Sequence, residues 1–204
     1  MKLFIIFFFI SISLSAHDSV YILQPVEITA ERPVNNFQSF ELIEKDEIQN
    51  FNTGVSLEET FSKIPGLIIN NRNNPSLGDK ISIRGIGSRS SFGIRGIKLF
   101  VDNIPLTLPD GQSQSNNIDF FSSGKVEILK GPASSFYGNA AGGVINFQTE
   151  FPENKILNVS PEIIFGSFGF QKYSLKISGE YNQHSYLLSL NNINNTGYRE
   201  HSAS

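Results

Sequence analysis

The sequence predicts a β-rich protein built of short elements. Its 204 residues include 17 glycines and 9 prolines, which interrupt the chain too often for long helices to be expected. Two strand-like segments, residues 124–130 and 143–149, flank a turn that is dense in glycine. Residues 172–181 alternate apolar and polar side chains, as a strand with two different faces does. These three observations favour sheets and loops over a helical bundle.

The N-terminus has the pattern of a secretory signal peptide. Lys2 precedes an apolar run from Leu3 to Leu14, and the small residues Ser15 and Ala16 follow it. We therefore expect residues 1–16 to be removed on export. A membrane anchor is the alternative, but the run is shorter than the ~20 apolar residues that a helix needs to cross a bilayer.

The composition excludes several kinds of site. The net charge is −3 at pH 7, so nothing in it favours binding to a nucleic-acid backbone. The chain has no cysteine, which excludes disulfides and thiolate metal sites within it. His17, His184 and His201 are too scattered to indicate a metal site or a catalytic base. The sequence therefore predicts no enzyme, no metal, no cofactor and no nucleic-acid partner.

Short elements are expected between the leader and the glycine-dense turn. Residues 40–48 are typical of a strand followed by an acidic turn. Ser56 is placed to cap a helix that carries Leu57, Phe61 and Ile64 at helical spacing, and a Pro-Gly pair ends it. Three further strands and a short helix are expected at residues 67–69, 80–84, 98–101 and 118–121.

Several motifs resemble the plug domain of TonB-dependent outer-membrane receptors. Residues 126–146 contain, in order, Val-Glu-Ile-Leu-Lys-Gly-Pro, Phe-Tyr-Gly and Gly-Gly-Val-Ile-Asn, which resemble the segment that closes this domain. Residues 83–85, Ile-Arg-Gly, are a further piece of the family pattern. Residues 102–105 resemble its Asp-Gly-Ile-Pro turn, with Asn103 in place of glycine, and asparagine tolerates the left-handed backbone. The turn at residues 137–143 is one residue shorter than in many relatives.

The resemblance implies a fold and a division into domains. It implies an α+β plug, a small mixed β-sheet with short helices, followed by the start of a transmembrane antiparallel β-barrel of about 22 strands. A periplasmic tether would occupy residues 17–36, the plug residues 37–150 and the first barrel strands residues 151–204. Only three or four strands fit after residue 150, so we expect either a fragment of a longer gene product or a truncated gene.

The alternating segment would place its two faces in different surroundings. In a barrel the apolar side chains would meet lipid and the polar ones the lumen. The apolar set is Tyr173, Leu175, Ile177, Gly179 and Tyr181, and the polar set is Lys172, Ser174, Lys176, Ser178 and Glu180. From these strands alone, a sheet in a soluble sandwich is the alternative.

Residues 25–33 form an extended segment with proline at each end. Prolines remove donors and keep their neighbours out of the helical region, so the segment can remain available for pairing. An edge strand or a disordered leader is the alternative. The resemblance implies that it is the TonB box, on which the periplasmic energy transducer pulls, with strand addition as the mode of binding. The transducer-binding residues would be Val26, Glu27, Ile28, Thr29 and Ala30.

Two loops are the candidates for ligand contact. The resemblance places both at the outward-facing top of the plug, where relatives bind ferric chelates or other scarce nutrients. Guanidinium groups offer forked donors to anionic oxygens, and amides and hydroxyls add adjustable hydrogen bonds. The alternative for any one residue of these loops is an ordinary solvated position without a role in binding. The candidate residues are Ser88, Arg89, Ser90, Phe92 and Arg95 in the first loop and Asp110, Gly111 and Gln112 in the second.

The resemblance also implies charge pairs between the plug and the barrel wall. Arg84, Glu127 and Lys130 are the candidates on the plug, and their partners would lie beyond Ser204. Removing one member of a buried pair leaves an uncompensated charge, so such pairs would hold the plug in place.

The implied function is energy-coupled uptake of a scarce nutrient across the outer membrane of a Gram-negative cell. A ferric siderophore is the favoured ligand, although cobalamin, other metal complexes and sugars are also used by the family. The implied partners are a TonB-type energy transducer with its inner-membrane proton-motive complex, the extracellular ligand and outer-membrane lipid. The alternatives are a periplasmic plug-like binding module, a nonfunctional truncated receptor and a soluble secreted β-protein.

Overall fold

The computed structural model describes residues 39–49, 53–70, 78–91, 93–152, 155–182 and 184–197. The predicted signal peptide, tether and TonB box lie outside these residues. All the described residues belong to one structural unit, which begins at Asn35. Within this part of the chain, no helix is long and apolar enough to span a membrane.

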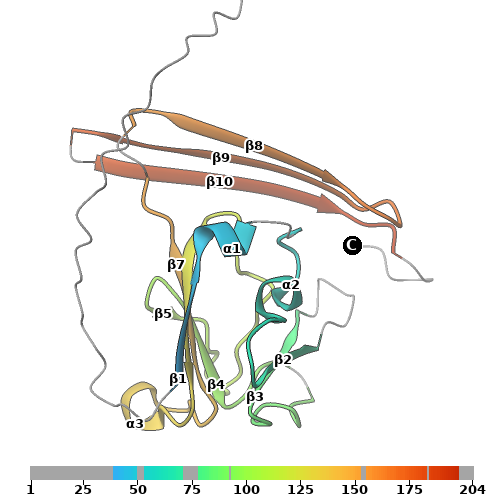
Figure 1. Ribbon diagram of the computed structural model, residues 1–204, viewed down its shortest axis with the longest axis vertical. Helices are drawn as coiled ribbons and strands as arrows, with labels where there is room; N and C mark the ends of the chain where they lie inside the picture. Colours follow the sequence, from blue (N-terminus) through green and yellow to red (C-terminus); the bar gives the residue numbers. More distant parts are fainter. Residues whose placement is uncertain are drawn as a thin grey trace, which may run out of the picture. The chain divides into compact units, whose positions relative to one another are not determined.

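The described residues form ten strands and three helices of about one turn each (Figure 1). In chain order they are β1 (Ser39–Glu44), α1 (Lys45–Gln49), α2 (Leu57–Phe61), β2 (Leu67–Asn70), β3 (Lys80–Ile83), β4 (Ile97–Val101), β5 (Ile104–Pro105), β6 (Ser123–Lys130), α3 (Ser134–Tyr137), β7 (Gly143–Thr149), β8 (Asn158–Phe165), β9 (Gln171–Tyr181) and β10 (His184–Asn194).

Three sheets contain these strands. The largest has the order β1-β6-β7-β4-β5, and its β4–β7 pair is parallel while its other pairs are antiparallel. The expected small mixed sheet with short helices is therefore confirmed. Strands β2 and β3 form an antiparallel pair, and β8, β9 and β10 form a separate antiparallel sheet in the order β10-β9-β8.

An aromatic and aliphatic core covers one face of the five-stranded sheet. Alternation along β6 buries Val126 and Ile128 completely, as the period of a strand requires. On β7 the Phe147 ring lies 6.0 Å from that of Phe61 and 5.9 Å from that of Phe120.

Helix α2 begins where its sequence predicts and ends earlier than expected. The Ser56 hydroxyl accepts a hydrogen bond from the backbone N–H of Glu58 at 3.1 Å, as an N-cap does. The helix ends at Phe61, so the expected turn carrying Ile64 is outside it. Pro65 has no N–H to donate to the Phe61 carbonyl, and the backbone N–H of Ile64 donates to that carbonyl instead, at 3.1 Å.

The expected short helix at residues 118–121 is wrong. The Asp119 carboxylate accepts from the backbone N–H of Phe121 at 3.1 Å, and its carbonyl accepts from the hydroxyls of Ser122 and Ser123. These local bonds to an aspartate compete with helical hydrogen bonding and fold the segment as a turn. Helix α3, in contrast, lies inside the glycine-dense turn, where no helix was expected.

The turn between β4 and β5 has the left-handed backbone that asparagine was expected to accept. Asn103 has a φ of 64° and Asp102 a φ of 50°. The Asp102 carboxylate also accepts from the backbone N–H of Thr149 at 2.8 Å and from its hydroxyl at 2.6 Å. The replacement of glycine in this motif is therefore accommodated.

Strand β9 has the expected alternation, and the polar face is the covered one. Lys172 and Lys176 are each only 3% exposed, whereas Tyr173 is 42% exposed and Tyr181 61%. Ser174 and Ser178 are buried on the same side as the lysines. The central strand of this sheet thus covers its polar side chains and leaves its apolar ones partly or fully exposed.

Candidate functional site

The two loops predicted to contact ligand lie side by side. Ile94 and Ser113 exchange backbone hydrogen bonds of 2.8 and 2.9 Å, which join the loop after β3 to the loop after β5. A third segment reaches the same place, because the Asn139 amide donates to the Gly111 carbonyl at 3.2 Å. Segments far apart in the sequence therefore form one cluster of loops.

Several candidate residues in these loops have structural partners. The Ser88 hydroxyl donates to the Gly85 carbonyl at 2.8 Å, and the buried Ser90 hydroxyl donates to a loop carbonyl at 3.0 Å. The Asp110 carboxylate accepts from the backbone N–H of Gln112 at 3.0 Å and from its side-chain amide at 2.6 Å. These groups shape the loops.

The two arginines of the first loop differ from these residues. Arg89 and Arg95 are both exposed, and neither forms an ion pair with any carboxylate of the described residues. Their guanidinium donors are therefore available to solvent and to an anionic group. Phe92 lies outside the described residues.

Two of the three candidates for pairing with a barrel wall have partners on the five-stranded sheet. Lys130 is buried, with its ammonium 2.8 Å from the Glu41 carboxylate on the neighbouring strand β1. Glu127 pairs with Lys125 on its own strand at 3.1 Å. Arg84 is exposed, with a φ of 50° at the end of β3. Pairing of the three with later strands stays a prediction.

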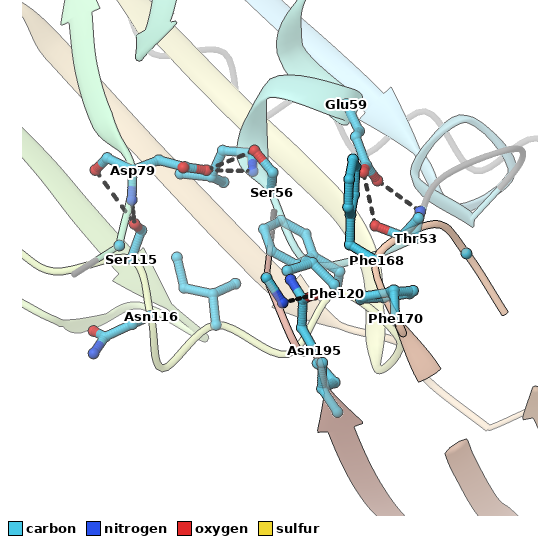
Figure 2. A pocket seen from close by; sticks show the side chains of 18 of the residues that line it. Thr53, Ser56, Glu59, Asp79, Ser115, Asn116, Phe120, Phe168, Phe170 and Asn195 are labelled. Atoms are coloured by element: carbon cyan, nitrogen blue, oxygen red, sulfur yellow. Dashed lines mark hydrogen bonds between the residues drawn. The ribbon is translucent and has the colours of Figure 1, made fainter. Parts of the chain in front are cut away.

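A cavity of about 450 Å³ lies between the loops around α2 and the turn that joins β8 to β9 (Figure 2). Its apolar wall includes Phe120, Phe168 and Phe170, whose rings gather below Glu59 in this view. Its polar wall includes Asp79 and Glu59. A cavity of this size and mixture can hold a small-molecule group.

Asp79 is the most constrained carboxylate of this cavity. It accepts hydrogen bonds from the Ser56 hydroxyl at 2.9 Å and from the backbone N–H of Leu57 at 2.8 Å. Burial raises the pKa of Asp79, these two hydrogen bonds oppose the rise, and the nearby charges of Glu58 and Glu59 add to it. Its backbone N–H donates to the Ser115 hydroxyl at 3.0 Å.

Glu59 closes another part of the cavity wall. Its two carboxylate oxygens accept from the backbone N–H of Thr53 at 2.6 Å and from the Thr53 hydroxyl at 2.7 Å. No lysine or arginine is among the described residues that line the cavity. The wall therefore suits an uncharged or positively charged group better than an anion.

Sequence reasoning missed this cavity. Its lining comes from five separate stretches of chain, among them residues 53–59, 78–79 and 166–170, and no motif spacing connects them. The Ser56 cap was a readable signal, but its second role as a donor to Asp79 depends on tertiary packing. Among the described residues, no three side chains of metal-ligating type gather.

Comparison with known proteins gives the family context. The model of the TonB-dependent receptor plug domain matches residues 33–144. The pesticin receptor of Yersinia pestis is 35% identical over 104 residues, which are 50% of this chain and 14% of that receptor. The chain thus matches only about a seventh of this relative's length.

Solved structures show the same fold at lower identity. The ferric yersiniabactin uptake receptor of Yersinia pestis is 24% identical, with a TM-score of 0.59 over 78% of this chain and 24% of its own. The pyoverdine outer membrane receptor of Pseudomonas aeruginosa PAO1 is 18% identical, with a TM-score of 0.60 over 78% of this chain and 22% of its own.

Proposed function

Because this chain belongs to the family of TonB-dependent receptor plug domains, we propose that it serves in energy-coupled uptake of a scarce nutrient across the outer membrane of a Gram-negative cell. One structural observation carries this proposal beyond the family match. A plug-type mixed sheet contacts the polar face of a second sheet, β8 to β10, whose apolar face is exposed.

The exposed apolar face of the three-stranded sheet supports a position in lipid. Its exposed side chains include Val159, Ile163, Phe165, Tyr173, Tyr186, Leu188 and Leu190. Large contiguous apolar patches are uncommon on soluble proteins and typical of surfaces that meet a membrane or a partner. We assign residues 151–204 to the first strands of a barrel with lipid outside and the plug inside, and residues 37–150 to the plug.

A ferric siderophore is the ligand that we favour. Arg89 and Arg95 offer exposed guanidinium groups beside the second loop, and a chelate with anionic oxygens would accept their forked donors. The remaining candidates in these loops, namely Ser88, Ser90, Phe92, Asp110, Gly111 and Gln112, would add hydrogen bonds or shape. The names of the ferric yersiniabactin and pyoverdine receptors are consistent with this class of ligand.

The proposed energy source is a TonB-type transducer driven by the inner-membrane proton gradient. It would pair by strand addition with Val26 to Ala30, which lie in the tether of residues 17–36. Residues 1–16 would direct export. Arg84, Glu127 and Lys130 would help to hold the plug inside the barrel. Coupling requires that ligand binds one plug state more tightly than the other. We propose no enzymatic activity.

Uptake of a radiolabelled ferric chelate by cells that express the full-length gene product tests this proposal. Deletion of Val26 to Ala30 should abolish uptake and leave binding at the cell surface intact. Arg89→Ala and Arg95→Ala should each weaken binding, whereas Lys98→Ala, on a strand, is the matched control for loss of one positive charge. Uptake that continued without the segment Val26 to Ala30 would contradict the proposal.

A further inference from the structure

Two lysines of β9 are buried against the five-stranded sheet and its loops. The Lys176 ammonium lies 2.8 Å from the Glu150 carboxylate and donates to the Phe121 carbonyl at 2.9 Å. The Lys172 ammonium lies 2.8 Å from the Glu162 carboxylate on β8 and donates to the Thr53 carbonyl at 2.8 Å. Each ammonium thus has an acidic partner and a carbonyl partner.

Both ammonium groups also lie over one aromatic ring. The Phe121 ring centroid is 4.6 Å from the Lys176 ammonium and 5.6 Å from that of Lys172. A ring face attracts a nearby cation, and this attraction is stronger where water is excluded. Phe121 therefore supports both lysines in one place.

Glu150 is the residue where the two sheets meet. It follows β7 directly, and its side chain is 7% exposed. One carboxylate oxygen faces Lys176, and the other lies 2.8 Å from the ammonium of Lys45 on α1. The backbone N–H of Glu150 donates to the Ser122 carbonyl at 2.9 Å, which fixes its position.

The rest of the covered face of β9 is also polar. Ser174 and Ser178 are buried there, and no apolar side chain of β9 alternates onto this side. Separation of the two sheets would therefore expose polar groups, which water can solvate, instead of an apolar core. The contact of β9 with the plug therefore rests on the Lys176–Glu150 pair and on hydrogen bonds from the two lysines to the carbonyls of Thr53 and Phe121, and not on apolar burial.

We propose that Glu150 and Lys176 form a latch that holds the five-stranded sheet against β9, and that loss of either charge alone lets the two sheets separate. Removal of the Glu150 charge leaves the Lys176 ammonium buried without an acidic partner. Removal of Lys176 leaves Glu150 with Lys45, whose side chain is 42% exposed, as its remaining cation among the described residues. Both changes favour the separated and solvated arrangement. The latch would act when the plug moves during uptake. This role of the latch, and no other part of the proposal, rests on the proposed function.

Hydrogen exchange of the full-length protein, measured without ligand or transducer, tests the latch. Glu150→Gln and Lys176→Met should each speed backbone exchange in residues 39–49 and 143–152 by about tenfold or more, through more frequent local opening. Lys125→Met is the matched control, because Lys125 and Glu127 form a pair on the same sheet that is 41% and 30% exposed. This control should leave exchange in both segments unchanged.

The double variant Glu150→Gln, Lys176→Met distinguishes a latch from ordinary packing. It leaves no buried charge without a partner, so its exchange should be slower than that of either single variant. Additive acceleration in the double variant, or unchanged exchange in both single variants, would overturn the proposal. If Glu150→Gln fails to fold, Glu150→Asp, which keeps the charge and shortens the reach by one methylene, should speed exchange in the same two segments. Unchanged exchange in this variant would also overturn the proposal.

Chelate uptake by the same variants separates the two proposals. Exchange is measured with no ligand present, so the latch can fail while uptake persists. Uptake can equally fail in the unaltered protein while the exchange results support the latch.

Discussion

The two larger sheets of this protein bury opposite kinds of side chain. In the five-stranded sheet, β6 turns Val126 and Ile128 into the core. In the three-stranded sheet, β9 turns Lys172 and Lys176 inward and leaves Tyr173 exposed. Both strands alternate with a period of two residues. Alternation of apolar and polar residues therefore identifies the two faces of a strand, but the neighbouring structure decides which face is covered.

The proposed position of the three-stranded sheet in lipid would explain the inversion. A sheet whose outer face meets water buries its apolar side, because apolar burial is the main driving force for folding in water. A sheet whose outer face meets lipid gains nothing by burying apolar groups, and it can turn polar groups towards a polar partner. With the proposed position in lipid, the plug sheet and the three-stranded sheet follow different rules within one chain.

The largest expected effect is in the core of the five-stranded sheet. Phe147→Ala removes the ring that contacts Phe61 and Phe120, and it should lower the free energy of unfolding by about 3–5 kcal/mol. Urea unfolding of the purified protein measures this loss. Tyr173→Ala, which removes an exposed ring of β9, should cost far less in the same assay, and equal losses would contradict the comparison.

The exposed face of the three-stranded sheet should be sensitive to charge in lipid. Leu188→Arg places a cation among the exposed apolar side chains of β10, and near the bilayer midplane it should cost about 2–4 kcal/mol. Reversible folding of the full-length protein into lipid vesicles measures this cost. Ser189→Arg, on the opposite face of the same strand, is the control. Equal insertion of both variants would show that this face does not meet lipid.

A smaller effect is expected at the start of β7, where the two paired strands approach closely. Gly143 has a φ of 144°, and a Cβ there would lie 2.2 Å from the Leu129 carbonyl oxygen. Gly143→Ala should therefore destabilise the protein by about 2–3 kcal/mol in urea unfolding. Gly85→Ala meets nothing within 4 Å and carries only backbone strain, so a loss of about 1 kcal/mol is expected.

The smallest effect is a change in pH dependence at the cavity. Because burial raises the pKa of Asp79, the native state holds this proton more tightly than the unfolded state. The contribution of Asp79 to stability is therefore most favourable below its unfolded pKa of 3.8 and is lost as the pH rises through the raised native value.

Asp79→Asn removes this titration. The free energy of unfolding of the variant, minus that of the unaltered protein, should become more positive as the pH rises from about 3.8. Urea unfolding over a pH series measures the difference. A difference that stays constant with pH would show that the Asp79 proton is held equally in both states.

Local signals in the sequence predicted most of the elements. The Ser56 cap, the strands on both sides of the glycine-dense turn and the left-handed backbone at Asn103 all depend on residues within a few positions. The helix expected at residues 118–121 does not form, because the Asp119 carboxylate accepts a hydrogen bond from the backbone N–H of Phe121 and stabilises a turn instead. Local competition of this kind is difficult to resolve from a short apolar pattern.

The contacts that position the sites could not be predicted in this way. The ammonium of Lys172 reaches the Thr53 carbonyl across 119 positions in the chain, and Lys130 reaches Glu41 across 89. No spacing rule links residues so far apart. The loops that carry Arg89 and Asp110 were found by resemblance, and their adjacency became visible only through the Ile94–Ser113 bridge.

A hydrogen bond lies at each end of the parallel pair formed by β4 and β7. The Gly142 N–H donates to the Gly96 carbonyl at 2.8 Å before the pair begins, and Asp102 holds Thr149 where it finishes. A slip of one residue would bring Val144 and Asn146 into the core in place of the side chains beside them. Pairing of distant strands closes a long loop and is slow to form. Once both hydrogen bonds have formed, the chain between β4 and β7 is a closed loop, and the register of this parallel pair is fixed.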